Sequence, residues 1–347
     1  MLKHPIMPVQ TLTVTEDEAG MRLDRWFKRH LPTLSLAHLN KIVRTGQVRI
    51  DGARATTATR LEAGQKIRIP PMKLAPEAQA AAPSEEDKRA IRAMILYEDD
   101  YLMVLNKPFG LAVQGGSGTP RHIDGMLASL VDARGERPVL VHRLDRDTCG
   151  VLLVAKSRRM AADLGEIFRS RRATKIYWAL VEGVPKPARG RISLFLAKGE
   201  GMEKERGAPR RGAERTDLEK MRVAQHGEAD AQHSVTYYAT VDKVPGRLAW
   251  LSMKPITGRT HQLRAHAEAI GHPIVGDPKY RGELRAERQI PEGIERKLHL
   301  LARRIVLPHP RGGVLDVTAP LPPHMRKSFE MFGFDAKRED PIEEAPE

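Results

Sequence analysis

The spacing of apolar residues over the first seventy positions predicts two short helices followed by a small sheet. From Leu23 onward the apolar residues recur every three to four positions, and Pro32 ends this series. A second series spans residues 36–43, and the alternating stretch 47–50 predicts a strand that leads into an Asp-Gly turn. We therefore predict a small α/β module over residues 11–71, with basic side chains on the outer faces of both helices.

Strand-like apolar runs return after residue 93 and predict a second, larger domain. Residues 72–92 are rich in Ala, Pro and Glu and predict a linker. Over residues 93–330, hairpin-like strands are interspersed with helical segments, which predicts an α+β fold with a mixed, mostly antiparallel sheet flanked by helices and loops. The charged, Gly- and Pro-containing stretch 198–222 predicts an inserted loop, and residues 331–347 a loose C-terminal tail.

Composition and charge limit the classes of function. The 347 residues include 58 Lys and Arg against 44 Asp and Glu, and the net charge of +14 favours a polyanionic partner such as nucleic acid. An apolar content of 41% excludes a wholly disordered chain, and no run approaches the ~18 apolar residues of a membrane span. The first residues lack a secretion or transit pattern, so we expect a cytoplasmic protein without membrane contact. The single cysteine, Cys149, excludes a disulfide framework and a Cys-rich zinc site.

The densest group of candidate catalytic residues lies at 141–156, where two apolar runs flank a short charged turn. A sheet that ends in such a turn presents its polar side chains at one fixed place. Asp145 lies between Arg143 and Arg146, which favour its ionised form, and it is the natural candidate for a nucleophile or base. An ordinary surface turn with local Arg–Asp pairs explains the same pattern equally well.

A second candidate segment spans residues 257–277. One helix face cannot hold His261, Leu263 and Arg264 together, so some of these polar groups face a site or the core. A solvated helix start is the alternative. A zinc site on His261, His266 and His272 is disfavoured, because the segment lacks the ligand spacing of zinc motifs.

The glycine-rich run 115–118 invites comparison with phosphate-binding loops. It matches neither of the common nucleotide-binding glycine motifs, so a flexible turn is the default interpretation and a nucleotide cofactor is not expected.

Taken together, the motifs resemble the RluA-type family of pseudouridine synthases, over about residues 95–330. The resemblance is strongest at H-R-L-D-R-D-T-C-G-V-L-L-V-A-K, residues 142–156. Further matches, in the family's order, are Asn106-Lys107-Pro108, the alternating stretch from Lys175 to Gly183, Gly258 to Arg264, Gly271 to Asp277, and Leu298-His299-Leu300. Gly115–Gly118 and Arg146-Asp147 resemble the C-type branch. The module at 11–71 resembles the small RNA-binding domain named after a small-subunit ribosomal protein.

This resemblance implies an isomerase that converts uridines, here in large-subunit ribosomal RNA, to pseudouridine without a cofactor or a metal. The N1–C1′ bond breaks, the uracil rotates and C5 joins C1′. The resemblance makes Asp145 the essential carboxylate, Tyr177 the aromatic residue against the uracil, and Arg264 the counter-charge of Asp145. Covalent attack by Asp145 and deprotonation of the sugar both remain open.

The resemblance and the charge pattern together suggest which residues contact RNA. Arg143 is a candidate for filling the stack that a flipped base vacates, and His261 and Gln262 are candidates for substrate contact. In the module, the candidate phosphate contacts are Arg22, Arg25, Lys41, Arg44 and Arg49. We expect a monomer. Cys149 stands where the family usually has Ser, and a thiol is the weaker hydrogen-bonding group.

Three alternatives remain at this stage. The first is an isomerase that acts on uridines of transfer RNA, because the same catalytic domain acts on several kinds of RNA. A non-catalytic RNA-binding ribosome-assembly factor would have no need of Asp145, Tyr177 and Arg264 together. An RNA methyltransferase would need a Gly-rich adenosylmethionine loop, which residues 115–118 match poorly.

Overall fold

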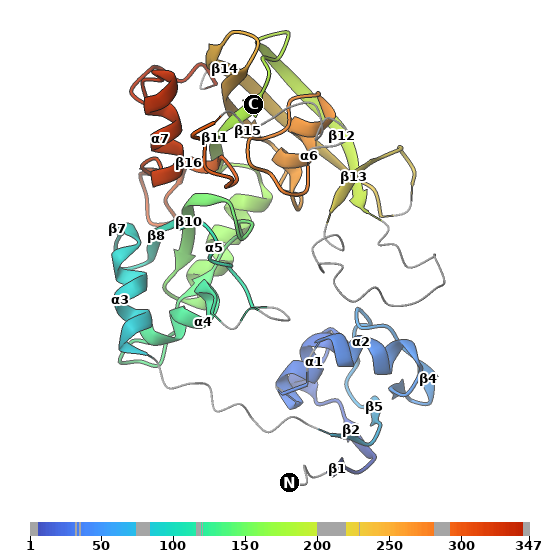
Figure 1. The fold of residues 1–347 in the computed structure, drawn as a ribbon. Coiled ribbons are helices and arrows are strands. Elements are labelled where there is room, and N and C mark those ends of the chain that lie inside the picture. Colours follow the sequence, from blue (N-terminus) through green and yellow to red (C-terminus); the bar gives the residue numbers. More distant parts are fainter. Residues whose placement is uncertain are drawn as a thin grey trace, which may run out of the picture. The chain divides into compact units, whose positions relative to one another are not determined.

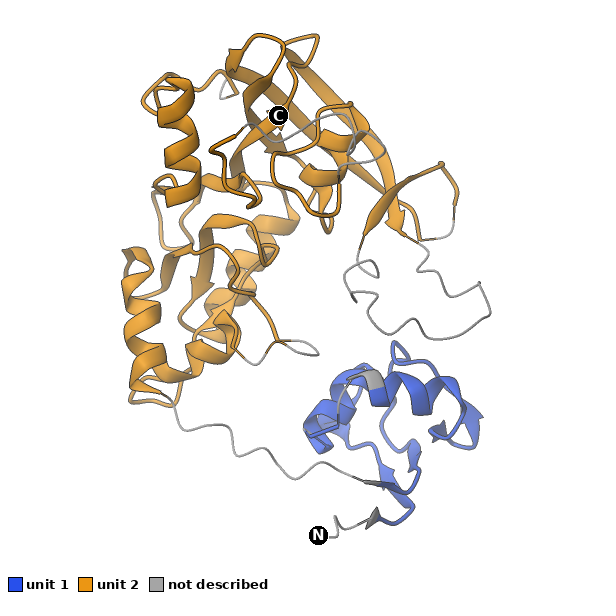
Figure 2. Ribbon diagram, in the orientation of Figure 1, with its two compact units in different colours: residues 1–82 blue, residues 83–347 orange. Residues whose placement is uncertain are grey.

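The computed structural model describes residues 6–31, 33–34, 36–73, 84–115, 119, 121–199, 220–228, 230–280 and 292–342. The chain forms two compact units, residues 1–82 and 83–347 (Figure 2). Residues 200–219 of the expected inserted loop, and Gly116–Gly118 of the glycine run, lie outside the described residues. In the described part of the chain, no helix has the length and apolar character needed to cross a membrane.

Unit 1 packs two helices on a small antiparallel sheet, as the apolar spacing predicts. The core includes Leu23, Trp26 and Phe27, which the helical spacing places on one face of the first helix. The Asp51-Gly52 turn has positive φ at both residues, which suits the tight hairpin between two strands. The helices are α1 (Leu23–His30) and α2 (Leu36–Arg44), with a 3-10 turn at Glu16–Glu18. The sheet order is β2 (Gln10–Thr13), β5 (Lys66–Ile69), β3 (Arg49–Ile50), β4 (Ala53–Arg54), and β1 (Ile6–Met7) pairs with β6 (Met72–Lys73).

Unit 2 is built on an 11-stranded sheet (Figure 1). Its pairs are antiparallel except for β10 with β16, which confirms the expected mixed, mostly antiparallel sheet. The strand order is β13 (Met221–Ala224), β12 (Arg189–Lys198), β14 (Gln232–Val244), β15 (Leu248–Pro255), β11 (Thr174–Glu182), β16 (Leu300–Pro308), β10 (Cys149–Ala155), β8 (Leu102–Lys107) and β7 (Ile95–Glu98). In addition, β17 (Val314–Thr318) pairs with β16, and β9 (Val139–Leu140) with β10.

Helices cover both faces of this sheet, because alternate strand residues point to opposite sides. Leu153 and Trp178 pack with α5 and α7, whereas their neighbours Leu152 and Ala179 belong to clusters on the other face. That second face carries α6 over one part of the sheet and α3 and α4 over another. The bounds are α3 (Glu85–Ala93), α4 (Ile123–Met126), a 3-10 turn (Leu127–Leu130), α5 (Arg158–Arg169), α6 (Gln262–Ala269) and α7 (Pro323–Phe332).

The prediction of a linker over residues 72–92 is wrong at both ends of this range. Met72 is buried in the core of unit 1, and residues 85–93 form α3, whose Ile91 is fully buried in unit 2. Ser84 caps α3 by accepting two backbone N–H bonds, and acidic residues follow in the first turn. A capped helix of mostly charged residues has the same composition as a linker, which is why composition misled here.

The loose tail expected over residues 331–347 is wrong as far as residue 342. The helix α7 extends to Phe332, and the side chains of Phe334 and Ile342 belong to the main core. The carboxylate of Asp340 accepts hydrogen bonds from Trp178 Nε1 and Ser252 Oγ, both at 2.8 Å. The segment therefore packs on the sheet through single, widely spaced residues that form no periodic pattern in the sequence.

Candidate active site

The turn that carries Asp145 is positioned by a glycine where two strands meet. Gly150, at the start of β10, has φ +103°, and a Cβ atom there would lie 2.2 Å from the carbonyl oxygen of Ala302 on β16. Both the backbone angle and the lack of space exclude a side chain. The close approach of β10 and β16 brings the preceding turn, residues 143–148, against the rest of the sheet.

Two side chains hold this turn from its two sides. His142 Nε2 accepts a hydrogen bond from the backbone N–H of Leu153 at 2.9 Å. The imidazole thus takes the place of the backbone carbonyl that a neighbouring strand would offer to this N–H. Burial lowers the pKa of His142 to about 4, which keeps Nε2 free to accept. On the other side, the buried Lys107 donates to the carbonyl oxygens of Pro108, Leu111 and Arg146 at 2.7–2.9 Å.

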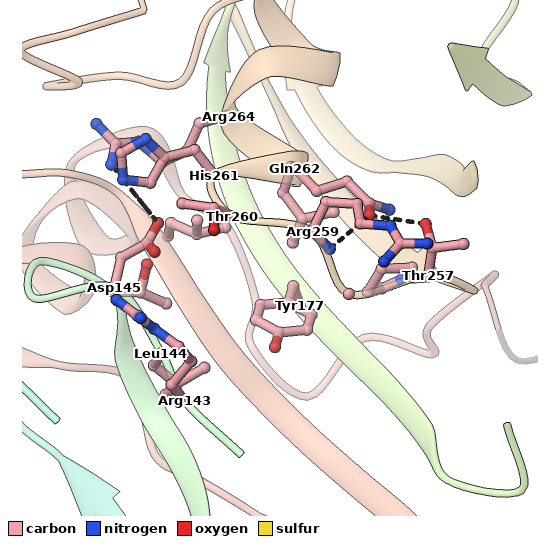
Figure 3. Close-up of a pocket in the computed structure, with 15 residues that line it drawn as sticks. Arg143, Leu144, Asp145, Tyr177, Thr257, Arg259, Thr260, His261, Gln262 and Arg264 are labelled. Carbon is pink, nitrogen blue, oxygen red and sulfur yellow. Dashed lines mark hydrogen bonds and ion pairs between the residues drawn. The ribbon is translucent and has the colours of Figure 1, made fainter. Parts of the chain in front are cut away.

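Tyr177 enters the site at an irregularity in strand pairing. The register of β11 against β16 shifts between Ile176 and Tyr177, and such a bulge changes the direction of the side chain that follows it. The ring lines the same pocket as Asp145 (Figure 3). Burial, and secondarily the charge of Asp145, raise the pKa of the Tyr177 hydroxyl, so the phenol is neutral at neutral pH.

Arg264, on α6, is the counter-charge of Asp145, and a second carboxylate holds it in place. Arg264 Nη1 lies 3.5 Å from Asp145 Oδ2. Its Nε and Nη2 atoms donate to the two oxygens of Asp277, each at 2.7 Å. Burial opposes the charge of Arg264, but the bonds to Asp277 outweigh it and raise its pKa. With two of its donor groups bound to Asp277, the guanidinium directs the remaining nitrogen at Asp145.

Asp277 is itself completely buried, and its Oδ1 also accepts the backbone N–H groups of Lys279 and Tyr280. The sequence pattern does not reveal this second carboxylate, because nothing in the chain near Asp277 indicates which cation it faces. The available signal is indirect: a buried arginine beside the carboxylate of Asp145 needs a further anion to fix its geometry.

Asp145, Tyr177 and Arg264 line a cavity of about 140 Å³ (Figure 3). Its walls come from the Asp145 turn, from Tyr177 on β11, from the loop 257–260 and from the first turn of α6. Arg143 is exposed at the cavity, where its side chain is accessible to a nucleotide. The structure thus brings together Asp145, Tyr177, Arg264, Arg143 and His261, which come from three separate segments of the sequence.

Gln262, a candidate for substrate contact, forms its hydrogen bonds within the protein. Its Oε1 accepts from Thr257 Oγ1 and from the backbone N–H of Arg259, and its Nε2 donates to Val235 O and Thr236 Oγ1. All its hydrogen-bonding groups are therefore used within the protein, and the side chain is buried. Gln262 holds the loop 257–260 against β14, and it also lines the cavity.

The histidines of this segment do not form a metal site. His261 faces Tyr280 and Asp145, His266 bonds to Ser234, and His272 bonds to the carbonyl oxygen of Glu182. Among the described residues, no group of three or more His, Cys, Asp or Glu side chains has a metal-binding arrangement.

In unit 1, the five candidate phosphate contacts fall into two groups. Arg25, Lys41 and Arg44 are exposed on α1 and α2. Arg22 is exposed but forks onto Asp24, and Arg49 is half-buried with its Nε donating to Gly46 O. The first three are thus the better candidates for contact with RNA.

Comparison with known proteins agrees with this geometry. The family model described as RNA pseudouridylate synthase matches residues 101–269. The ribosomal large subunit pseudouridine synthase C of Escherichia coli strain K12 is 36% identical over 343 residues, which cover 95% of this chain and 98% of that protein. The chain belongs to the RNA pseudouridylate synthase family. The protein is therefore an isomerase whose partner is RNA, and the resemblance drawn from the motifs is confirmed.

Other relatives agree with this family assignment. The synthase C of Pasteurella multocida strain Pm70 is 36% identical over 326 residues, covering 92% of each chain. Among solved structures, human RNA pseudouridylate synthase domain containing 4 has a TM-score of 0.55 and 29% identity, and the match covers 70% of this chain and 94% of that one. The expected similarity to the C-type enzymes is thereby confirmed. The roles of individual site residues in this pseudouridine synthase are predictions.

Proposed function

We propose that this protein converts uridines of large-subunit ribosomal RNA to pseudouridine, with Asp145 as the essential carboxylate. The observation that carries the proposal is the Asp145–Arg264 pair, at 3.5 Å, in a cavity that Tyr177 also lines. The names and near full-length coverage of the relatives support ribosomal RNA over transfer RNA as the substrate. A non-catalytic binding factor would not need a carboxylate, an arginine and a tyrosine around one cavity.

The reaction exchanges one glycosidic bond for another. The N1–C1′ bond of the uridine breaks, the uracil turns within the cavity, and C5 bonds to C1′. The proton on C5 is lost and N1 gains one, so no oxidant, reductant or outside group is consumed. Asp145 acts on the sugar or base, either as a nucleophile or by removing a sugar proton, and Arg264 forms an ion pair with its carboxylate.

Tyr177 and Arg143 act on the uracil base, whereas Asp145 acts at the glycosidic bond. The neutral Tyr177 ring packs against the uracil, and its hydroxyl assists removal of the C5 proton. A uridine within a helix must first be flipped out, at a cost of a few kcal/mol. The exposed Arg143 side chain at the cavity is suited to fill the stack that the uracil leaves.

The test uses ribosomal RNA labelled with tritium at C5 of uridine, because formation of the C5–C1′ bond releases that hydrogen. Asp145→Asn should release none while still binding RNA. Asp147→Asn is the matched control, since Asp147 lies in the same turn but does not line the cavity. Substantial tritium release by Asp145→Asn would remove Asp145 from the proposed role.

The target class needs a separate experiment. Pseudouridines are mapped in total RNA from a strain that lacks the protein, and loss is expected only at sites in large-subunit RNA. Loss confined to transfer RNA would overturn the proposed substrate while leaving the chemistry intact. Work on ribosomal RNA also implies a cytoplasmic protein, and we propose that it acts as a monomer without a cofactor.

Unit 1 is proposed to anchor the RNA through Arg25, Lys41 and Arg44. Each phosphate contact contributes roughly 0.7–0.9 to the slope of log affinity against log salt. Replacing all three residues with Gln should therefore weaken RNA binding and flatten this slope by about 2–3. An unchanged slope would assign the RNA contacts to other residues.

A further inference from the structure

His261 occupies an unusual backbone position next to Asp145. It precedes α6 with φ 51° and ψ 19°, the left-handed region that residues other than glycine seldom adopt. Such strain persists only where the surrounding structure enforces it, and it is common at functional sites. The ring is only 7% exposed, and this conformation places it in the cavity wall between Asp145 and Tyr280.

The hydrogen bonds of Tyr280 determine which ring nitrogen of His261 carries the proton. Tyr280 is fully buried, and its hydroxyl oxygen accepts the backbone N–H of Met221 at 2.7 Å. The same oxygen lies 3.0 Å from His261 Nδ1. Burial raises the pKa of Tyr280, so the phenol keeps its proton. Within the described residues no other acceptor faces this hydroxyl; it therefore donates to Nδ1, and the neutral imidazole carries its hydrogen on Nε2.

This tautomer points an N–H group at the catalytic carboxylate. His261 Nε2 lies 3.8 Å from Asp145 Oδ2, the same oxygen that Arg264 Nη1 approaches to 3.5 Å. Catalytic hydrogen bonds are often long without substrate and tighten once it is bound. Two donors on Oδ2 leave Oδ1 as the oxygen available to the nucleotide.

The surroundings of His261 favour its neutral form. Burial lowers its pKa most, the charge of Asp145 opposes this effect, and Arg264 and Lys279 add to the lowering while Asp277 acts against it. The net result is a lowered pKa, so the ring is uncharged at neutral pH. A neutral donor orients Asp145 without adding a second cation to that of Arg264.

We propose that His261 is a positioning residue of this enzyme: its Nε2–H and Arg264 together hold Asp145 Oδ2, so that Oδ1 faces the target uridine. The proposal rests on the role of Asp145 in the proposed function. Tyr280 takes part in the same arrangement, because its hydroxyl fixes the tautomer of His261 and its ring lies 5.0 Å from the Arg264 guanidinium.

Two conservative variants test which nitrogen matters. In His261→Gln the side-chain amide reaches the position of Nε2, whereas in His261→Asn it reaches only that of Nδ1. Asn is also the better tolerated of the two in the left-handed region, so a purely structural role favours His261→Asn. The proposal expects the reverse: kcat falls about 10- to 100-fold in His261→Asn, as for loss of one hydrogen bond to a charged group, and only a few-fold in His261→Gln. KM should change little in either variant.

A third variant and one spectroscopic measurement complete the test. Tyr280→Phe removes the donor to Nδ1 and should lower kcat severalfold at unchanged KM. In the wild-type protein, ¹⁵N NMR of labelled histidine should find His261 neutral, with the proton on Nε2. A proton on Nδ1, an effect confined to KM, or kcat in His261→Asn equal to or above that in His261→Gln would each overturn the proposal. Failure of the proposed function would give a different result. The wild-type protein would then release no tritium, whereas the NMR measurement would still find His261 neutral with its proton on Nε2.

Discussion

The buried pair of Arg264 and Asp277 allows the cost of one carboxylate to be calculated. Asp277→Asn keeps the shape of the side chain but removes its charge. Asp277 Oδ1 accepts three hydrogen bonds and Oδ2 accepts one, from Arg264 Nε. With the amide oxygen in the place of Oδ1, the new NH₂ group would face the N–H of Arg264. One charge-assisted bond is lost, and among the described residues the guanidinium keeps Asp145, at 3.5 Å, as its counter-charge.

The expected loss of unfolding free energy is about 3–5 kcal/mol, the usual cost of removing one partner of a buried pair. The chain offers a matched control, because Asp316 binds Arg304 through the same Nε and Nη2 fork at 2.7 and 2.6 Å. That pair is on the surface, with side chains 29% and 43% exposed, so Asp316→Asn should cost only about 0–1 kcal/mol. The two pairs differ in burial and in the two backbone N–H groups that also donate to Asp277.

Urea unfolding followed by tryptophan fluorescence measures both variants, because the buried Trp178 and Trp250 report on unit 2. A shift of midpoint at constant slope gives the change in free energy. The kcat of Asp277→Asn should also fall by at least tenfold, since Arg264 is no longer held against Asp145. A cost below 1 kcal/mol for Asp277→Asn, or an equal cost for Asp316→Asn, would refute the reasoning from burial.

Three further predictions concern the parts that position the site. Gly150→Ala should cost at least about 2 kcal/mol more than Gly312→Ala in thermal unfolding, because both glycines have φ near +102° but only Gly150 lacks room for a Cβ; equal costs would show that β10 and β16 separate easily. The folded protein binds a proton on His142 only near pH 4, whereas the unfolded chain binds it near 6.5, so stability is lost as the pH falls through that window. Wild type should lose roughly 2–3 kcal/mol more than His142→Gln between pH 7 and 4, and superimposable pH profiles would contradict this assignment. Tyr177→Phe should retain RNA affinity while tritium release collapses; near-normal release would show that the hydroxyl is not used.

The local pattern of apolar and polar residues determined many of the helices and strands of this protein. The helical spacing after Leu23 and the alternation around Tyr177 predict elements that the structure contains, because burial on one face imposes a period on the sequence. The charged turn between apolar strands also made Asp145 a candidate, and the structure places its side chain in the cavity. The motifs together were specific enough to predict the family.

Contacts between distant segments were decided only by the tertiary structure. Nothing near Asp277 in the sequence indicates that it holds Arg264, and nothing near Gln262 indicates that its NH₂ group donates to β14. The C-terminal segment packs through single residues such as Phe334, which carry no periodic signal. Hydrophobic periodicity records which face of an element is buried, whereas the partner of a buried polar group depends on which strands become neighbours. For this reason the sequence pointed to Asp145 as the candidate carboxylate, and the fold showed that Arg264 and His261 lie beside it.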